Sequence, residues 1–118
     1  GFDVVYENAQ NIFFDFERDR FSDRFSGEEP VSFKYLDCDL LIIDDLGTEV
    51  VNQFTTACLY NVINSRLNRK KSTVINTNFT RDEMRKKYQD RITSRIFGEY
   101  MVLPFMGSDI REIKLMKK

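Results

Sequence analysis

Two adjacent carboxylates, Asp44 and Asp45, are the residues of this chain whose types and spacing point most directly to chemistry. They follow the apolar run Leu40–Ile43 and precede Gly47. An uninterrupted apolar run suits a parallel strand that is covered on both faces, and ligands gather at the carboxyl ends of such strands. Two carboxylates there are expected to bind a cation such as the Mg²⁺ of nucleotide hydrolases. The alternative is a core strand that ends in an acidic turn without any such role.

The rest of the composition narrows the chemistry that could accompany these acids. The chain has no histidine, which excludes Ser-His-Asp and Cys-His schemes in their usual form as well as His-based zinc sites. Its two cysteines, Cys38 and Cys58, lack CxxC spacing, so we expect buried, reduced thiols. Acid, base and metal chemistry would therefore fall to carboxylates.

Length and charge set further limits. The 118 residues, 42% of them hydrophobic, suffice for one domain with a core but are few for a complete α/β nucleotide hydrolase. The apolar runs are far shorter than a membrane span and no leader pattern opens the chain, so we expect a cytoplasmic protein without a membrane partner. Residues 1–50 carry a net charge of −9 and residues 51–118 carry +8. This division favours head-to-tail self-association or a basic surface for nucleic acid, and charges that interleave after folding are the alternative.

Hydrophobic periodicity and turn residues predict alternating strands and helices. The expected strands lie at residues 2–6, 40–43, 72–78 and 100–103. The expected helices begin after a cap at Asn8, at residues 31–36, at 53–68, and at a capping box of Thr80 and Glu83 that opens a helix running to about residue 97. Residues 21–30 and 104–109 read as polar turns, and the final segment 110–116 is left without an assigned element. The order β-α-β-α-β-α-β is typical of a parallel sheet.

With these pieces in order, the chain resembles the AAA+ ATPases of the DnaC/DnaI helicase-loader and IstB group, from just after the P-loop helix to near the carboxyl end. The resemblance rests on DLLIIDDLGTE at 39–49, NTN at 76–78 and YQDRITSRI at 88–96. Together these segments are specific, whereas each alone is not. The implied fold class is α/β, a parallel-sheet P-loop NTPase (AAA+) core that is incomplete because the first strand and the P-loop helix are missing. Residues 1–118 would be a single partial AAA+ domain.

The resemblance also implies roles for individual residues. Asp44 would hold Mg²⁺ through water at the Walker B position, and Asp45 would polarise the attacking water, where many relatives have the longer Glu. Asn78 resembles the sensor-1 residue, which holds that water and the terminal phosphate; an amide that caps the strand end is the alternative. Arg95 matches the arginine finger that reaches into a neighbouring subunit's nucleotide site. Arg111 resembles a sensor-2 residue, which contacts the phosphates within its own subunit.

Other basic residues allow two interpretations each. Arg91 lies one helical turn before Arg95 and either shares the task of the finger or forms a salt bridge on the helix surface. Several more basic residues could line a DNA path: Arg66, Arg69, Lys70, Lys71, Arg85, Lys86 and Lys87. For all of these, an ordinary solvated surface is the competing interpretation.

The chain departs from the family at the phosphate-binding loop. No segment fits GxxxxGK[ST], and none of the five glycines is followed by lysine. The family's first strand lies between the sensor-1 strand and the last strand, so its absence is expected to leave a gap in the core. Because Gly1 is not an initiator methionine, we expect a fragment of a longer protein. ATP and Mg²⁺ would be cofactors of the intact ATPase, whereas the isolated chain should bind ATP feebly and be inactive.

The implied function is that of an ATP-dependent loader that places a replicative helicase on single-stranded DNA during replication initiation and self-associates through an arginine finger. An IstB-like ATPase that assists a transposase is the alternative within the same group. A non-catalytic relic that binds DNA or a partner through its basic half is another. A phosphoacceptor receiver domain also clusters aspartates at strand ends, but it requires acids from separate strands and a later Lys-Pro, which this chain lacks.

Overall fold

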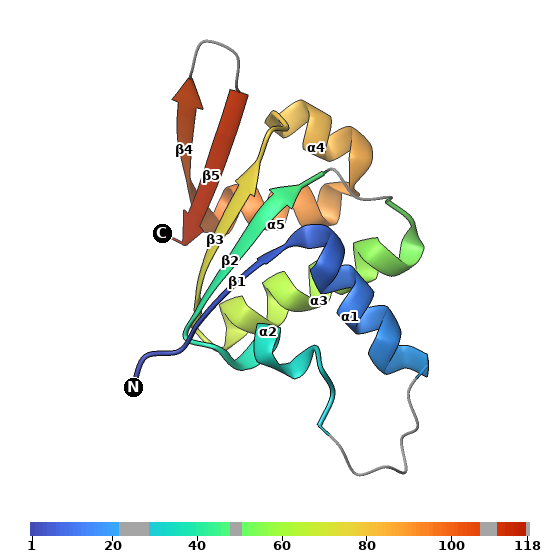
Figure 1. The fold of residues 1–118 in the computed structure, drawn as a ribbon. Helices are drawn as coiled ribbons and strands as arrows, with labels where there is room; N and C mark the ends of the chain where they lie inside the picture. The colour runs from blue at the N-terminus through green and yellow to red at the C-terminus, as the bar shows by residue number, and fades with distance from the viewer. Residues whose placement is uncertain (22–28, 48–50, 107–110, 118) are drawn as a thin grey trace.

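The described residues form strands and helices that alternate as the sequence predicts, except that one predicted helix is divided in two and a further strand follows the last predicted one (Figure 1). The computed structural model describes residues 1–21, 29–47, 51–106 and 111–117; of these, Phe21 and residues 104–106 and 111–117 are described by their backbone alone. The strands are β1 (Val4–Asn8), β2 (Leu40–Leu46), β3 (Ser72–Thr77), β4 (Tyr100–Met106) and β5 (Arg111–Lys117). The helices are α1 (Ala9–Phe21), α2 (Phe33–Asp37), α3 (Gln53–Asn68), α4 (Arg81–Lys87) and α5 (Asp90–Glu99). None of these helices is long and apolar enough to cross a membrane.

The strands form one sheet in the order β1-β2-β3-β5-β4. β1, β2 and β3 pair in parallel, whereas β5 pairs antiparallel with both β3 and β4. The predicted parallel sheet is therefore confirmed for the first three strands, and β4 runs in their direction without pairing with them. The expected gap beside the sensor-1 strand is wrong for the described structure. The segment that had no assigned element forms β5, which satisfies the backbone hydrogen-bonding groups along that edge of β3.

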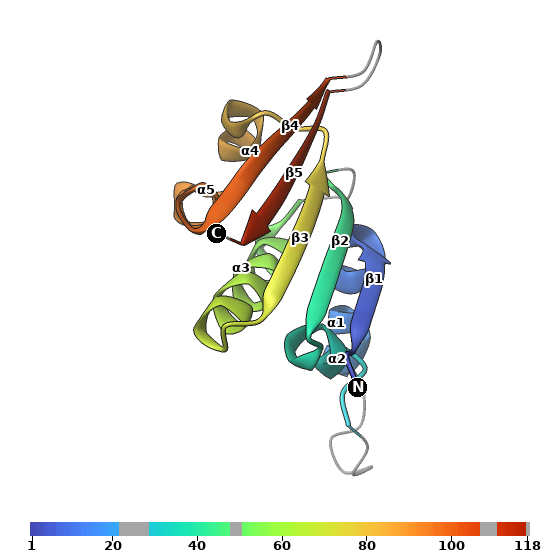
Figure 2. The same cartoon turned by 90° about the vertical axis from the view of Figure 1, so that its left-hand side faces the viewer.

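The helices pack on one face of this sheet and leave the other face open (Figure 2). Burial alternates along β2, where Ile43 is buried and its neighbour Ile42 is only half-buried. On β1, the side chains of Val4 and Tyr6 are 50% and 61% exposed. We call the side of Ile43 the covered face and the side of Ile42 the open face. The prediction that the apolar run is covered on both faces is thus wrong for the described residues, because nothing described packs over the open face.

The sequence predicts one helix over residues 80–97, and the structure shows two. Between α4 and α5, Tyr88 has an extended backbone with φ −113° and ψ 165°, and α5 begins at Asp90. The Tyr88 ring is buried in the core, as are Met84 before it and Ile92 after it. The predicted packed face is therefore confirmed, whereas the continuity of the helix is wrong. The spacing of four residues between buried side chains is kept across the break, so the pattern does not reveal it.

Side-chain caps fix where the helices begin. Asn8 caps α1 as predicted, because its Oδ1 accepts the backbone N–H one turn into the helix at 2.8 Å. The predicted capping box is also present: Thr80 Oγ1 accepts the Glu83 backbone N–H at 3.2 Å, and the Glu83 carboxylate accepts the Thr80 N–H at 3.4 Å. Asn52 and Thr55 form a second capping box at the start of α3. Each cap contributes about 0.5–2 kcal/mol by satisfying helix N–H groups that have no partner within the helix.

Arg66 is a fully buried arginine that ties three elements together. Its Nε donates to Thr73 Oγ1 at 2.8 Å, Nη1 donates to the carbonyls of Tyr35 and Cys38 at 3.0 and 2.9 Å, and Nη2 donates to the Ser72 carbonyl at 2.7 Å. Burial lowers the pKa of this guanidinium, and these acceptors offset the cost of removing it from water. Arg66 therefore joins α3 to α2 and β3. The suggestion that it lines a DNA path is wrong.

Both cysteines are buried and free, as the sequence predicts. Burial raises the pKa of Cys58 to about 11. Burial also raises the pKa of Cys38, although the neighbouring Arg66 partly offsets this effect. Neither thiol is therefore poised as a thiolate near neutral pH.

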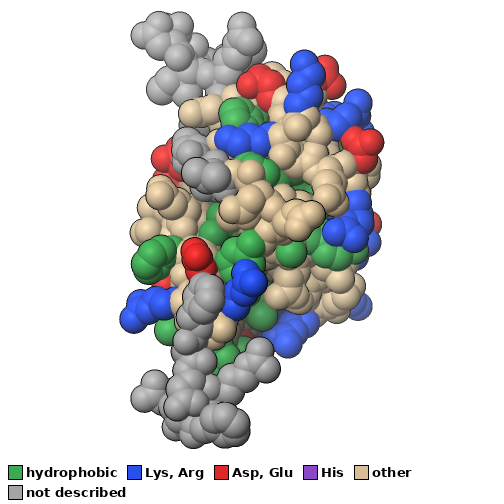
Figure 3. Space-filling model, turned by 90° about the vertical axis from the view of Figure 1, so that its right-hand side faces the viewer, with side chains coloured by type: hydrophobic (Ala, Val, Ile, Leu, Met, Phe, Trp, Pro, Cys, Tyr) green, Lys and Arg blue, Asp and Glu red, His purple; other side chains and the backbone are tan. Residues whose placement is uncertain are grey.

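The charge division along the sequence does not give a surface of one sign on the helical side of the molecule. Figure 3 shows Lys and Arg side chains distributed over this side with Asp and Glu among them. Lys71 Nζ of the basic half lies 3.6 Å from Asp39 Oδ1 of the acidic half, so the charges of the two halves interleave in part. Of the residues suggested for a DNA path, Arg69, Lys70, Arg85 and Lys86 are exposed.

Candidate functional site

The carboxyl ends of β2 and β3 bring the two acids and the sensor-1 candidate to one edge of the sheet. Asp44 and Asp45 lie near the end of β2, and Asn78 directly follows β3. β5 starts at Arg111, and its antiparallel register places that start at the same edge. The Arg111 side chain lies outside the described residues, so its predicted contact with phosphates stays a prediction.

Asp44 is held on the open face by two neighbouring strands. The Tyr6 hydroxyl on β1 donates to Asp44 Oδ2 at 2.8 Å, and Asn76 Nδ2 on β3 donates to Asp44 Oδ1 at 3.1 Å. A donor on each oxygen fixes the plane of the carboxylate. The other end of the same amide, Asn76 Oδ1, is buried without a hydrogen-bond partner among the described residues. The Asp44 carboxylate therefore lies beside an amide whose oxygen has no described hydrogen-bond partner, which marks a candidate ligand site.

These oxygens fit a Mg²⁺ that is held mostly by water and phosphate. Mg²⁺ prefers oxygen ligands, keeps several of its waters, and is usually bound through one or two carboxylates together with substrate phosphates. Within the described ranges there is no group of three or more His, Cys, Asp or Glu side chains that could enclose a metal ion. An ion at Asp44 would therefore take most of its ligands from water and from a bound nucleotide.

Asp45 is set apart from Asp44 by an irregularity in the strand. The pairing of β2 with β3 shifts register between Ile43 and Leu46, and Asp45 has φ 55°. This left-handed conformation costs roughly 1 kcal/mol or more for a residue with a side chain, though Asp adopts it more readily than most. Asp45 is exposed, whereas Asp44 is half-buried. The bulge thus separates two consecutive carboxylates, with one on the open face and one toward solvent at the sheet edge.

The end of β3 is capped by Thr77 rather than by the sensor-1 candidate. Thr77 Oγ1 donates to the Leu46 carbonyl at 2.6 Å and accepts the Phe79 backbone N–H at 3.2 Å. The side chain of Asn78 is exposed. The interpretation of Asn78 as a mere strand-end cap therefore loses its support, since the threonine beside it makes these contacts.

The two arginines of α5 lie away from the acids. The guanidinium of Arg91 stands over the Tyr60 ring, 4.2 Å from its centroid, so the contact seen is a cation–π contact rather than the suggested salt bridge. Arg95 is half-buried, and its Nε is buried without an acceptor among the described residues. α5 packs on the covered face of the sheet (Figure 2), whereas the alternation of burial along β2 and the contacts with Tyr6 and Asn76 place Asp44 on the open face. The structure therefore does not bring Arg95 and Asp44 together within one chain.

Sequence reasoning missed two residues of this site, Tyr6 and Asn76. The polar end of the strand at 72–78 was recognised, but the contact of Asn76 with Asp44 depends on the register that pairs Ile43 with Ile75. Tyr6 had no comparable signal, because its contact depends on the register between β1 and β2 over a separation of 38 residues.

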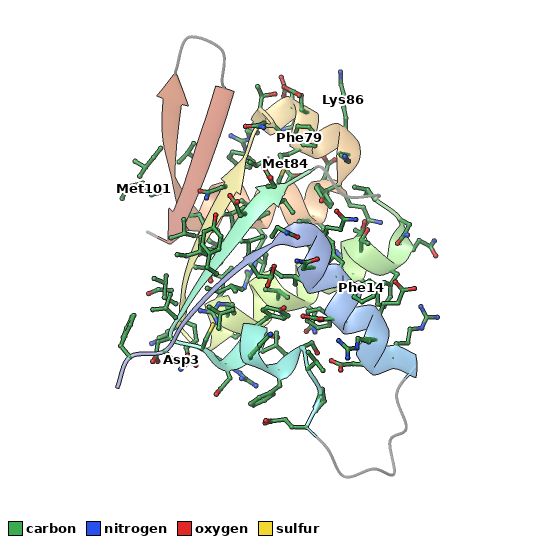
Figure 4. The ribbon with its side chains drawn as sticks, in the orientation of Figure 1. Asp3, Phe14, Phe79, Met84, Lys86 and Met101 are labelled. Carbon is green, nitrogen blue, oxygen red and sulfur yellow. The ribbon has the colours of Figure 1, made fainter. Side chains whose placement is uncertain are left out.

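A recess of about 620 Å³ lies between α1 and the amino end of α3. Its aromatic and charged lining includes Phe13, Phe14, Glu17, Arg20 and Phe54. Arg20 is already engaged over the Phe54 ring, 5.2 Å from its centroid. Figure 4 shows Phe14 on α1 and Phe79 near the start of α4, so the two lie in different parts of the molecule. None of the predicted site residues lines this recess, so the candidate chemistry stays at the strand ends.

The order and direction of β1, β2 and β3, with helices between them, are those of the AAA+ P-loop NTPase class. The fold is similar to the crystal structure of the DnaC helicase loader, with a TM-score of 0.65 at 20% identity over 81% of this chain and 56% of that chain. It is also similar to AMPPCP-bound DnaA from Aquifex aeolicus, with a TM-score of 0.59 at 20% identity over 83% of this chain and 30% of that chain. The chain thus spans little more than half of the first structure and less than a third of the second.

Sequence comparison assigns the family. The IstB-like ATP binding protein family matches residues 1–101, and the chain belongs to that family. No curated protein sequence matches the chain significantly. The resemblance to AAA+ ATPases of the DnaC and IstB group is therefore confirmed.

Proposed function

We propose that this chain is the Walker B and sensor-1 part of a cytoplasmic AAA+ ATPase that loads a replicative helicase onto single-stranded DNA during replication initiation. The observation that carries the proposal is the environment of Asp44. Its carboxylate is oriented by Tyr6 and Asn76 at the carboxyl edge of a parallel sheet, next to an unpaired amide oxygen. A strand that merely ended in an acidic turn would not require a carboxylate oriented from both sides.

The residues at the strand ends have separate roles in the proposed phosphoryl transfer. Mg²⁺, when bound with ATP, neutralises charge on the phosphates. Asp44 would hold a water of the ion, and Asp45 would polarise the attacking water from its exposed position. Asn78 would position that water and the terminal phosphate through its amide. Because aspartate is one methylene shorter than glutamate, the water has to approach Asp45 more closely than it would approach a glutamate.

Arg95 acts on a neighbouring subunit in this proposal. Its helix packs on the covered face and Asp44 lies on the open face, which favours action in trans over action in the same chain. Such an arginine contributes a factor of roughly 10³–10⁵ to turnover in other phosphoryl-transfer enzymes. Arg111, at the start of β5, is proposed to contact the phosphates of its own subunit.

Mixed assemblies test this arrangement. In the product of the complete reading frame, Arg95→Ala and Asp44→Ala should each abolish the turnover that assembly stimulates. An equal mixture should recover up to about a quarter of the activity, because that share of interfaces pairs an intact finger with an intact acid. Arg69→Ala, an exposed arginine on the same molecule, is the matched control and should remain active. A mixture that stays inactive while the subunits co-assemble would refute the finger in trans.

An accessory ATPase for a transposase is the second candidate function, and the family match favours it. The residues proposed for ATP hydrolysis are the same in both cases, so only the identity of the partner protein distinguishes the two functions. A purified replicative helicase and a purified transposase of the type that IstB-like ATPases assist should be tested for ATP-dependent binding to the complete product. Binding to the helicase alone supports the loader, and binding to the transposase alone supports the accessory ATPase. A reading frame without GxxxxGK[ST] would instead favour a non-catalytic relic.

A further inference from the structure

Side chains from the β3–α4 region hold the turn that follows the two acids. Thr77 Oγ1 donates to the Leu46 carbonyl at 2.6 Å. The Phe79 ring lies on Gly47, where a β-carbon would come within 2.5 Å of it. The Lys87 ammonium donates to the Gly47 carbonyl and stands over the same ring, 4.9 Å from its centroid. The turn is thus fixed by a hydroxyl from the last residue of β3 and by a ring and a cation from the segment that follows it.

Lys87 differs from its neighbours in the basic run at the end of α4. Lys86 is exposed, and Figure 4 shows it pointing away from the molecule. On the surface, Arg85 Nη1 lies 4.0 Å from Asp82 Oδ1 and Arg85 Nε lies 3.5 Å from Asp90 Oδ1. Lys87 alone of the three is half-buried and directed at the backbone of another element. Its placement in a DNA path on the basis of sequence is therefore not supported.

The position of Asp45 depends on this turn. Asp44 before it is oriented by Tyr6 and Asn76, and Leu46 after it is bound by Thr77. Asp45 lies between these fixed residues with φ 55°. A left-handed residue other than glycine persists when the surrounding contacts impose it. The backbone conformation from which the Asp45 carboxylate projects is consequently held by the contacts of Leu46 and Gly47.

We propose that Lys87 is a positioning residue for Asp45: it holds the Leu46–Gly47 turn in place, so that the carboxylate is presented at the strand edge. The proposal rests on the proposed ATPase function and adds a residue that no family resemblance assigned. It also links the acidic turn to the helix pair α4–α5, which carries Arg95. A change in the packing of α4 would therefore move the residue that polarises water.

The first test measures the turn in the 118-residue chain. Lys87→Met, which keeps the length and apolar character of the stem, should accelerate hydrogen exchange of the residue 45–47 amides by roughly tenfold, in keeping with the loss of a charge-assisted hydrogen bond. Lys86→Met is the matched control and should leave these amides unchanged. If Lys87→Met proves unfolded by circular dichroism, Lys87→Gln, which keeps a donor, should still accelerate exchange several-fold. Equal exchange in the folded Lys87 variant and the Lys86 variant would overturn the proposal.

The second test measures catalysis in the product of the complete reading frame. Lys87→Met should lower kcat about tenfold while leaving the affinity for ATP unchanged, since Asp45 acts on water rather than on nucleotide binding. Lys87→Arg, which can donate to the carbonyl and stack on the ring, should restore most of the rate. If Asp44→Ala leaves turnover intact, the proposed function fails. If Asp44→Ala abolishes turnover and Lys87→Met is as active as Lys86→Met, the role of Lys87 fails and the ATPase stands.

Discussion

The covered and open faces of the sheet are built from alternate residues of the same strands, yet they differ in burial and in the polar groups that they carry. On the covered face, Ile43 and Ile75 are almost fully buried against the helices. On the open face, Ile42 is half-buried and Tyr6 is 61% exposed. The covered face also carries the buried polar network of Arg66. The open face instead carries the oriented carboxylate of Asp44.

This difference separates stability from function within single strands. Side chains on the covered face lose all their water on folding, so each is expected to contribute strongly to the free energy of unfolding. Side chains on the open face keep much of their solvent exposure and contribute less. Substitutions of consecutive residues therefore form matched pairs in which the backbone site is nearly the same and only the face changes.

The largest effect is expected at Arg66 on the covered side. Arg66→Leu removes the donor from the buried Tyr35 and Cys38 carbonyls and the buried Thr73 hydroxyl, and should lower the free energy of unfolding by about 3–5 kcal/mol. Arg69→Leu, three residues later and exposed, should change it by less than about 0.5 kcal/mol. Urea denaturation monitored by circular dichroism measures both. Equal effects would show that the buried network does not hold the fold.

The second pair tests the two faces directly. Ile43→Ala removes a side chain that is 2% exposed and should cost about 3 kcal/mol, because it leaves a cavity between sheet and helices. Ile42→Ala removes the same atoms from the open face and should cost about 1 kcal/mol. Urea denaturation of the two variants under identical conditions gives the difference. An equally large loss for Ile42→Ala would mean that the open face is covered in solution.

The third pair compares two glycines at which substitution by alanine is expected to change the stability in opposite directions. Gly47→Ala should destabilise the chain by about 2 kcal/mol, because Gly47 has φ 113° and a β-carbon would meet the Phe79 ring. Gly98→Ala in α5 meets no atom within 4 Å and should stabilise it by up to about 0.5 kcal/mol through helix propensity. The midpoints of thermal unfolding should move in opposite directions. A shift of both in the same direction would contradict the geometry of the turn.

The smallest expected difference involves two tyrosine hydroxyls. Tyr35 is buried and its hydroxyl donates to the Asp15 carboxylate, so Tyr35→Phe should cost about 1.5–2 kcal/mol. Burial and Asp15 also raise the pKa of Tyr35 above its usual range. Tyr6→Phe on the open face should cost less than about 0.5 kcal/mol in stability. Denaturant titrations that rank the pair in the reverse order would contradict the expected contrast between a buried hydroxyl and a hydroxyl on the open face.

Local sequence signals predicted the elements well where one element contains the whole signal. The helix expected at residues 53–68 is α3 with the same bounds, and the Thr80–Glu83 capping box is present. The break at Tyr88 was missed because the buried positions continue at helical spacing across it. The spacing of apolar residues indicates which side of a helix is buried but does not indicate a local change of backbone direction.

Long-range pairing was the part that the sequence did not reveal. β5 pairs with β3 across more than 35 residues, and no local pattern specifies which strand edge a terminal segment joins. The openness of one face was missed for a similar reason, because apolar residues at Leu40 and Ile42 predict a cover without saying whether it is present. Asn76 and Tyr6 enter the site only once the strand register is known.

The most direct test of the account is Mg²⁺-dependent ATP hydrolysis by the product of the complete reading frame, with Asp44→Ala compared to Asp37→Ala. Asp37 is an exposed carboxylate at the end of α2, so its removal controls for loss of charge alone. The account predicts that Asp44→Ala abolishes turnover while Asp37→Ala leaves it unchanged. Undiminished turnover in a folded Asp44→Ala protein would contradict the assignment of this strand end as the magnesium and nucleotide site.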